Sequence, residues 1–284
     1  MNVYFDNAAT TPIRNEVIEE ISLVMKECFG NPSSSHAFGR TAKTHLETAR
    51  KGVAKLLNAL PQEIIFTSGG TESDNMILHC AVKDLGVKTL ISSRIEHHAV
   101  LHALDALKEN HGVEVLYVNV LRDGSIDLKH LESLLQSDTS KKLVSLMHVN
   151  NEIGNILDLD KTGNLCHEND AYFHTDAVQG VGHFSFDLAK LPIDFLSAAA
   201  HKFHGPKGVG FSFVRKNTGL KSFIYGGSQE RGLRAGTESV HNIVGLHKAL
   251  SLAYEGLENE SAQVLSLKQY FIESLFELFP NVVF

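Results

Sequence analysis

The sequence predicts an α/β protein with a mostly parallel sheet that is covered by helices on both faces. Short runs rich in β-branched and aromatic residues alternate with longer segments whose apolar residues recur at helical spacing. Strands are expected at residues 63–67, 88–92, 113–118, 142–149, 171–174, 195–199 and 209–214. Repeated strand–helix–strand units need crossover connections, and such connections make neighbouring strands parallel.

Helices are expected between these strands and on either side of them. They cover residues 70–85, 97–110, 127–137 and 158–169, and one at residues 39–58 precedes the first strand. The chain is again helical from about Ser239, and residues 280–284 (PNVVF) have the composition of a strand's beginning. A chain that stops there is expected to lack the sheet to which that strand belongs.

Length and composition set the broad class. The 284 residues, 43% hydrophobic and 21% charged, suffice for a sizeable core and more than one domain. A net charge of -7 gives no reason to expect nucleic acid or an anionic membrane surface as a partner. No apolar run approaches the ~20 residues of a membrane span, and the N-terminus lacks signal-peptide features. Three scattered cysteines, Cys28, Cys80 and Cys166, do not form a disulfide framework, which favours a cytoplasmic location.

A Gly-rich turn at residues 67–75 (TSGGTESDN) joins a strand to a helix. Thr71 and Asp74 have the spacing of an N-terminal capping box. The free N–H groups and the positive dipole end of such a helix suit a phosphate. A plain strand–helix turn fits the same residues.

Two further segments place polar residues at strand ends. Asp176 and Gln179 follow the strand that begins near residue 171, where parallel sheets bind ligands, although Asp176 alone also fits a helix N-cap. Lys202 follows the apolar run FLSAAA and precedes a Gly-Pro turn. Most lysines are solvated, but one held at a buried strand end loses proton affinity and becomes a nucleophile toward aldehydes.

Eight short sequence motifs, taken in their order along the chain, resemble those of the cysteine desulfurases of the class V aminotransferase group. They are FDNAATT at 5–11, FGNPSSSH at 29–36, GGTESDN at 69–75, EHHAV at 96–100, HVNNEIG at 148–154, HTDAVQ at 174–179, HKFHGPKG at 201–208 and GGSQERGLRAGTES at 226–239. The resemblance implies pyridoxal 5′-phosphate as cofactor and a seven-stranded sheet of fold type I. It also implies a large cofactor-binding domain at 13–245, with residues 1–12 and 246–284 in an incomplete small α+β domain.

The resemblance assigns a role to each candidate residue. Lys202 would hold the cofactor covalently and move the substrate's α-proton, and Asp176 would pair with the pyridinium nitrogen. His97 would stack on the ring and move protons, although on its own it fits an exposed histidine at a helix start. Asn150 and Gln179 would lie near the ring oxygen and the substrate amine. The phosphate would be held by Gly70, Thr71 and His201, and Thr237 would contact the phosphate across a homodimer interface.

The implied activity is abstraction of sulfur from L-cysteine, giving L-alanine and a persulfide for iron–sulfur cluster or thio-cofactor assembly. A sulfur-acceptor or scaffold protein would be the partner. The chain departs from the family pattern at Ala199, where the family usually has a phosphate-binding serine. The persulfide-forming cysteine loop and the arginine that binds the substrate carboxylate would lie beyond Phe284, so a truncated member is expected. Cys28 is the one cysteine worth testing as a substitute thiol.

Three alternatives stay open. The chain could be a non-catalytic cofactor-binding remnant or scaffold, or another class V enzyme such as a selenocysteine lyase. His98 and His102 have the i, i+4 spacing of a helical metal chelate. No acidic third ligand accompanies them and the HExxH pattern is lacking, so no metal site is expected.

Overall fold

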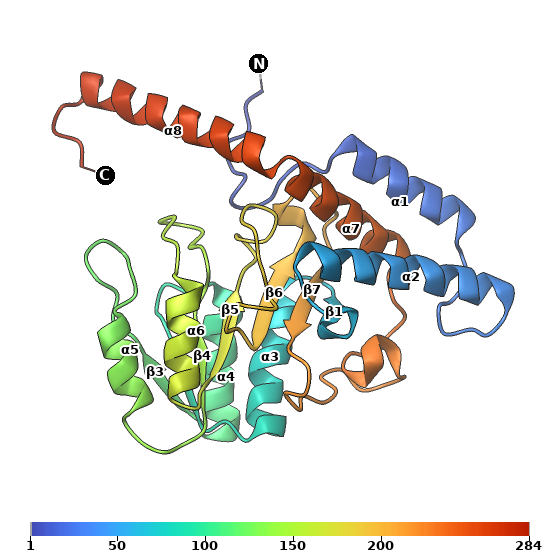
Figure 1. The fold of residues 1–284 in the computed structure, drawn as a ribbon, viewed down its shortest axis with the longest axis horizontal. Coiled ribbons are helices and arrows are strands. Elements are labelled where there is room, and N and C mark those ends of the chain that lie inside the picture. Colours follow the sequence, from blue (N-terminus) through green and yellow to red (C-terminus); the bar gives the residue numbers. More distant parts are fainter. Residues whose placement is uncertain (1, 284) are drawn as a thin grey trace.

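The computed structural model describes residues 2–283, and at its centre lies one seven-stranded sheet (Figure 1). The strands are β1 (Ile64–Thr67), β2 (Thr89–Ser92), β3 (Glu114–Tyr117), β4 (Lys142–Ser145), β5 (Tyr172–Asp176), β6 (Phe195–Ala199) and β7 (Gly210–Val214). Their order across the sheet is β1-β7-β6-β5-β4-β2-β3. β7 runs antiparallel to β1 and β6, and the other neighbouring pairs are parallel. The predicted α/β fold with a mostly parallel sheet is confirmed.

Eight α-helices occur in the described chain. They are α1 (Asn15–Glu27), α2 (Ala37–Leu56), α3 (Gly70–Leu85), α4 (His98–His111), α5 (Leu128–Leu135), α6 (Leu159–Glu168), α7 (Val240–Glu255) and α8 (Leu257–Leu278). Asp127 and Asp158 cap the first turns of α5 and α6 with their carboxylates. Gly86 and Gly112 end α3 and α4 in the left-handed conformation. These local signals explain why the sequence locates these helices well.

Each face of the sheet has its own hydrophobic core. α3 and α4 cover one face, where Ile77 and Leu104 pack in the same cluster as Leu90 and Phe195. α1, α2, α5, α6 and α7 contribute to the core on the other face. Because most of the strands are buried on both sides, their middles are filled with apolar residues and polar chemistry is confined to their ends.

Two segments differ from the sequence-based expectations. α1 was not predicted, because only Val17 and Val24 of its residues are buried and the apolar pattern is thin. Residues 280–283 form a turn and irregular backbone in place of the expected strand, and no strand of residues 2–283 pairs with them. The last residue of that predicted strand, Phe284, lies outside the described residues.

α8 extends away from the body of the protein and buries none of its residues (Figure 1). α7, by contrast, buries Leu246, Leu250 and Ala253 in the core of the sheet domain. We therefore propose that the C-terminal part of the small domain begins with α8 at Leu257, later than the predicted boundary at residue 246. Of the helices in the described chain, none combines the length and the apolar composition that a bilayer crossing requires.

Candidate active site

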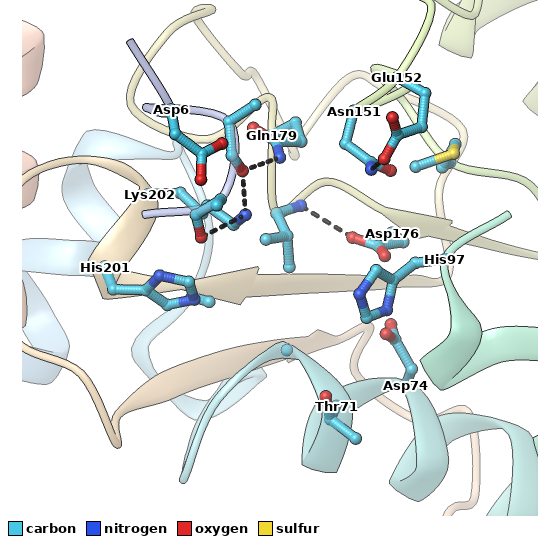
Figure 2. Close-up of a pocket in the computed structure, with 16 residues that line it drawn as sticks. Asp6, Thr71, Asp74, His97, Asn151, Glu152, Asp176, Gln179, His201 and Lys202 are labelled. Carbon is cyan, nitrogen blue, oxygen red and sulfur yellow. Dashed lines mark hydrogen bonds between the residues drawn. The ribbon is translucent and has the colours of Figure 1, made fainter. Parts of the chain in front are cut away.

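A cavity of about 470 Å³ lies at the carboxyl ends of the parallel strands (Figure 2). Its wall combines the start of α3, the segments that follow β2, β4, β5 and β6, and the N-terminal segment around Ala8. Seven of the nine predicted site residues line it, namely Gly70, Thr71, His97, Asp176, Gln179, His201 and Lys202. The structure does not bring Asn150 or Thr237 into this cavity.

Lys202 ends a short 3₁₀ turn, η2 (Ala200–Lys202), that directly follows β6. Its Nζ donates to the carbonyl oxygens of Ala8 and Ala9, the latter at 3.0 Å. Partial burial lowers the pKa of Lys202, although Asp176 and Asp6 act in the opposite direction. A lowered pKa increases the fraction of neutral amine, the form that attacks an aldehyde.

Asp176 is the last residue of β5 and is only 5% exposed. Its Oδ1 accepts a hydrogen bond from the Val178 N–H at 2.9 Å, and a turn follows, so Asp176 does not cap a helix. Burial raises its pKa, while the Val178 N–H, His97 and Lys202 favour the charged form. Among residues 2–283 this carboxyl belongs to no ion pair. A buried carboxylate that forms no ion pair within the described chain suits a cationic ligand.

His97 and Gln179 approach the cavity from two sides. His97 is the N-cap of α4, where its Nδ1 accepts from the Ala99 N–H at 3.1 Å. It is thus both an exposed helix-start histidine and a cavity residue, and its ring faces the side where Asp176 lies (Figure 2). Gln179 donates its Nε2 to the Ala8 carbonyl at 2.9 Å, so one carbonyl of the N-terminal segment serves both Gln179 and Lys202.

The start of α3 forms the opposite wall. Its N-cap is Gly69 and has no side-chain cap, which leaves N–H groups free for an anion. At Gly70 a Cβ would lie 2.6 Å from Val178 Cγ2, so a larger residue does not fit. The predicted capping box of Thr71 and Asp74 is wrong: Glu72 accepts from the Ser68 N–H at 2.8 Å, and Asp74 is buried.

His201 lies next to Lys202 and also contacts the N-terminal segment. Its Nδ1 pairs with Thr10 Oγ1 at 3.1 Å, and partial burial, with the charges of Lys202 and Lys207, lowers its pKa. A neutral imidazole is thereby favoured, with a ring nitrogen available for a hydrogen bond to a phosphate oxygen.

Asn150 is buried beside the cavity, but its side chain forms hydrogen bonds with backbone groups. Its Nδ2 donates to Ile95 O at 2.7 Å, and its Oδ1 accepts from the N–H groups of Glu152 and Ile153. The next residue, Asn151, lines the cavity instead. Asn150, which was expected near the ring oxygen or the substrate amine, therefore does not line the cavity, whereas Asn151 does.

Thr237 is exposed and lines a separate groove with Ser68 and Arg234. The loop that carries it is fastened to α3, because Arg234 Nε donates to Glu72 Oε1 at 2.7 Å. Thr237 is thus not part of the cavity wall of its own chain.

The cavity fits pyridoxal 5′-phosphate on three independent features. Lys202 offers an amine for the aldehyde, Asp176 offers a buried carboxylate for the pyridinium, and the uncapped start of α3 at Gly70 offers N–H groups for the phosphate. His98 and His102 have ring centroids 5.1 Å apart, and the described chain holds no cluster of three or more metal-ligating side chains.

Comparison with known proteins agrees with this assignment. The family model described as aminotransferase class-V matches residues 3–282. The chain belongs to the class-V aminotransferase family. Two proteins named cysteine desulfurase IscS, from Dictyoglomus turgidum and Methanosarcina thermophila, are 47% and 46% identical to it. The alignments cover 96% and 97% of this chain, and 69% and 68% of those relatives.

Solved structures give the same picture. A structure titled NifS-like protein matches with a TM-score of 0.94 and 41% identity over 98% of this chain and 77% of its own. A second, titled SspA in complex with cysteine, matches with a TM-score of 0.82 and 38% identity over 88% of this chain and 72% of its own. By family this class-V protein is a cysteine desulfurase-like transferase, and its cofactor is pyridoxal 5′-phosphate.

Several residues that line the cavity were not among the site residues predicted from the sequence. They are Asp6, Ala8, Ala9, Asp74, Asn151 and Glu152. All six lie inside motifs that carried the family resemblance, so the signal was present. These motifs do not indicate which of two adjacent side chains points into the cavity. Beyond the end of a strand, successive side chains no longer point alternately to opposite faces of the sheet.

Proposed function

We propose that this class-V protein removes sulfur from L-cysteine in the cavity at the strand ends. The observation that carries the proposal is the presence of Lys202 and Asp176 in one cavity, the first with a lowered pKa and the second buried without an ion-pair partner. The IscS relatives and the cysteine-bound SspA structure support cysteine as the substrate.

Each side chain has a defined task in the proposed reaction. Bound pyridoxal phosphate supplies an electron sink that makes the substrate's α-proton acidic. Lys202 would hold the cofactor through Nζ, and the same amine would take the substrate's α-proton and return a proton. Asp176 keeps the ring nitrogen protonated. His97 lies on the ring side of the cavity and supplies or removes protons near neutral pH.

The polar residues around these three orient the ligands. Gln179 and Asn151 are placed to hydrogen-bond the ring oxygen or the substrate amine. Gly70, Thr71 and His201 would hold the phosphate. We further propose a homodimer, because Thr237 is exposed and lies outside its own chain's cavity, as expected of a residue that reaches the phosphate of a partner subunit.

The sulfur transfer needs a thiol. The C–S bond of cysteine breaks, a thiolate forms a bond to that sulfur, and the released carbon takes a proton to become the methyl group of alanine. Cysteine and a thiol thus give alanine and a persulfide, with no external oxidant or reductant. None of the three cysteines lines the cavity. We therefore propose that the accepting thiol lies outside the described residues, and that its persulfide sulfur passes to a sulfur-acceptor or scaffold protein of cytoplasmic iron–sulfur or thio-cofactor assembly.

A non-catalytic scaffold that binds the cofactor is the second candidate. It is favoured by the cavity wall, which contains neither a cysteine nor an arginine for the substrate carboxylate. The two candidates share cofactor binding and differ in whether alanine is formed.

The experiment has two stages. The purified chain is first mixed with pyridoxal phosphate beside Lys202→Ala and the control Lys207→Ala, which changes an exposed lysine of the same turn. An absorption band of lysine-bound cofactor is expected in the wild type and the control, and its absence from both would disprove the cofactor site.

L-cysteine is then added with and without dithiothreitol as the small thiol, and alanine is measured. Alanine that depends on Lys202 is expected, formed faster with dithiothreitol, since L-cysteine is otherwise the only small thiol in solution. Cofactor binding without alanine under either condition would establish the scaffold, and loss of alanine formation in Cys28→Ala would disprove an accepting thiol outside the described residues.

A further inference from the structure

A second buried carboxyl group, that of Asp74, lies at the cavity beside Asp176 (Figure 2). Asp74 belongs to the first turns of α3, and its side chain is 1% exposed. Its Oδ1 has no hydrogen-bond partner. The proposed reaction assigns this residue no role, yet a buried carboxylate with one oxygen unpaired would be costly to maintain.

The buried ring of His174 does not neutralise Asp74. His174 Nε2 lies 3.5 Å from Asp74 Oδ1, but this ring already pairs with Ser145 Oγ at 2.9 Å and with Ser197 Oγ at 3.1 Å. Complete burial lowers the pKa of His174 to about 3, so the ring is neutral at physiological pH.

The charged groups around Asp74 are mostly of its own sign. Asp176 on β5 and Glu96 after β2 are both buried. His97, His201 and Lys202 are the basic groups that line the cavity, and Lys202 Nζ donates to backbone carbonyls of the N-terminal segment. Burial, and then the charges of Asp176 and Glu96, raise the pKa of Asp74, while a hydrogen bond with Ser197 opposes the rise. Two ionised carboxylates in one buried site repel each other.

We propose that Asp74 is a positioning residue that retains a proton, so that Asp74 and Asp176 together carry one negative charge and that charge is located on Asp176. The Val178 N–H donates to Asp176 Oδ1, whereas Asp74 Oδ1 receives no such bond, and this asymmetry decides which carboxyl ionises. A ring cation then meets a single fixed carboxylate. The inference deepens the proposed function and rests on it only for the identity of the cation.

Infrared spectroscopy of the cofactor-free protein tests the proton's location. Difference spectra at pH 7 compare the wild type with Asp74→Asn and Asp176→Asn in the carbonyl region of protonated carboxylic acids. Asp74→Asn should remove one such band and Asp176→Asn should remove none. Loss of the band in Asp176→Asn alone, or no change in Asp74→Asn, would overturn the proposal. Because no cofactor is present, this result is independent of whether the protein binds pyridoxal phosphate.

Isotope labelling gives a readout that needs no variant. Wild-type protein with ¹³C in its aspartate carboxyl groups should show a protonated-acid band shifted from its unlabelled position. A band that does not shift would arise from glutamate alone and would contradict the assignment to Asp74.

Cofactor affinity separates a neutral Asp74 from a charged one. Asp74→Asn keeps the shape and the absence of charge, so the pyridoxal phosphate dissociation constant at pH 7 should stay within about twofold of wild type. Asp176→Asn should weaken binding strongly. A loss of affinity in Asp74→Asn as large as that in Asp176→Asn would show that Asp74 is charged in the complex and would refute the inference.

Discussion

Arg50 and Glu230 form a buried ion pair in which each guanidinium Nη donates to one carboxylate oxygen at 2.7 Å. Glu230 is 4% exposed and adopts a left-handed conformation with φ 44°. It also accepts from the Phe66 N–H at 2.8 Å. The pair therefore ties α2 to β1 and to the loop that carries Thr237, and it compensates for the strain of a non-glycine residue at positive φ.

We predict that Glu230→Gln destabilises the fold by about 3 kcal/mol, because it removes the buried counter-charge of Arg50 and leaves only the partly exposed Glu47, 3.1 Å from Nε, as an ion-pair partner in the described chain. Urea unfolding measures the change. Lys161→Gln is the matched control, since it breaks an exposed pair with Asp158 and should have no measurable effect. Equal stability of wild type and Glu230→Gln would show that the ion pair contributes nothing.

Ala199→Ser should tighten pyridoxal phosphate binding. Ala199 lines the cavity, and its Cβ lies 3.8 Å from the position that a Cβ of Gly70 would occupy, close to the start of α3. A serine hydroxyl there adds one hydrogen bond to a charged phosphate, worth about 1.5–3 kcal/mol, or roughly 10-fold or more in affinity.

The control is Ala198→Ser, which changes the neighbouring strand residue that faces the hydrophobic core on the other side. It should lower stability without tightening cofactor binding. An unchanged dissociation constant for Ala199→Ser would argue against phosphate binding at this position.

Ionisation of Glu96 should lower the stability of the folded protein as the pH rises from 4.5 to about 8. Burial raises the pKa of Glu96 from 4.5 to about 8, so the folded protein holds a proton that the unfolded chain releases above its ordinary pKa. At this group the native state binds more protons across that window, and its contribution to the unfolding free energy decreases with pH.

Glu96→Gln should remove part of this slope, gaining stability relative to wild type between pH 5 and pH 8. Unfolding free energies measured at several pH values test this. Parallel curves for the two proteins would mean that Glu96 is ionised in the folded state.

The cysteines should differ in reactivity, with Cys28 alkylated first. Cys28 is partly exposed, whereas burial raises the pKa of Cys80 to about 12 and also raises that of Cys166. Thiolate is the reacting form, so the buried pair should react only on unfolding.

Mass spectrometry after iodoacetamide treatment at pH 8 gives the order of modification. Alkylated Cys28 should leave cofactor binding intact because this residue does not line the cavity. Loss of binding upon its modification would instead support Cys28 as a functional thiol.

The sequence predicted the sheet well because most of its strands are buried on both faces and are apolar throughout. Helices α5 and α6 were located because their N-caps, Asp127 and Asp158, mark each helix start in the local sequence. α1 was missed because two buried valines in thirteen residues do not make a clear stripe.

The site was predicted less completely, and the errors have a physical cause. Asp176 is the last residue of β5 and Lys202 ends the short turn after β6, so their position in the sequence fixes their position at the edge of the sheet. Asn150 and Asn151 lie beyond the end of β4 in a turn, where hydrogen bonds to Ile95 and Ile153 decide which side chain turns inward. Asp74 was read as a helix cap because its burial depends on residues far away in the chain, such as His174.

The contact between Lys202 and the carbonyl oxygens of Ala8 and Ala9 joins positions 194 and 193 residues apart. During synthesis, the first ten residues emerge from the ribosome long before Lys202, although both line the same cavity. The cavity therefore cannot close until residue 202 has emerged, and contacts between such distant positions form slowly. A nascent chain that stalls earlier would expose the carboxyl ends of its finished strands, so the same contact that completes the cavity also sets when the protein can first accept its cofactor.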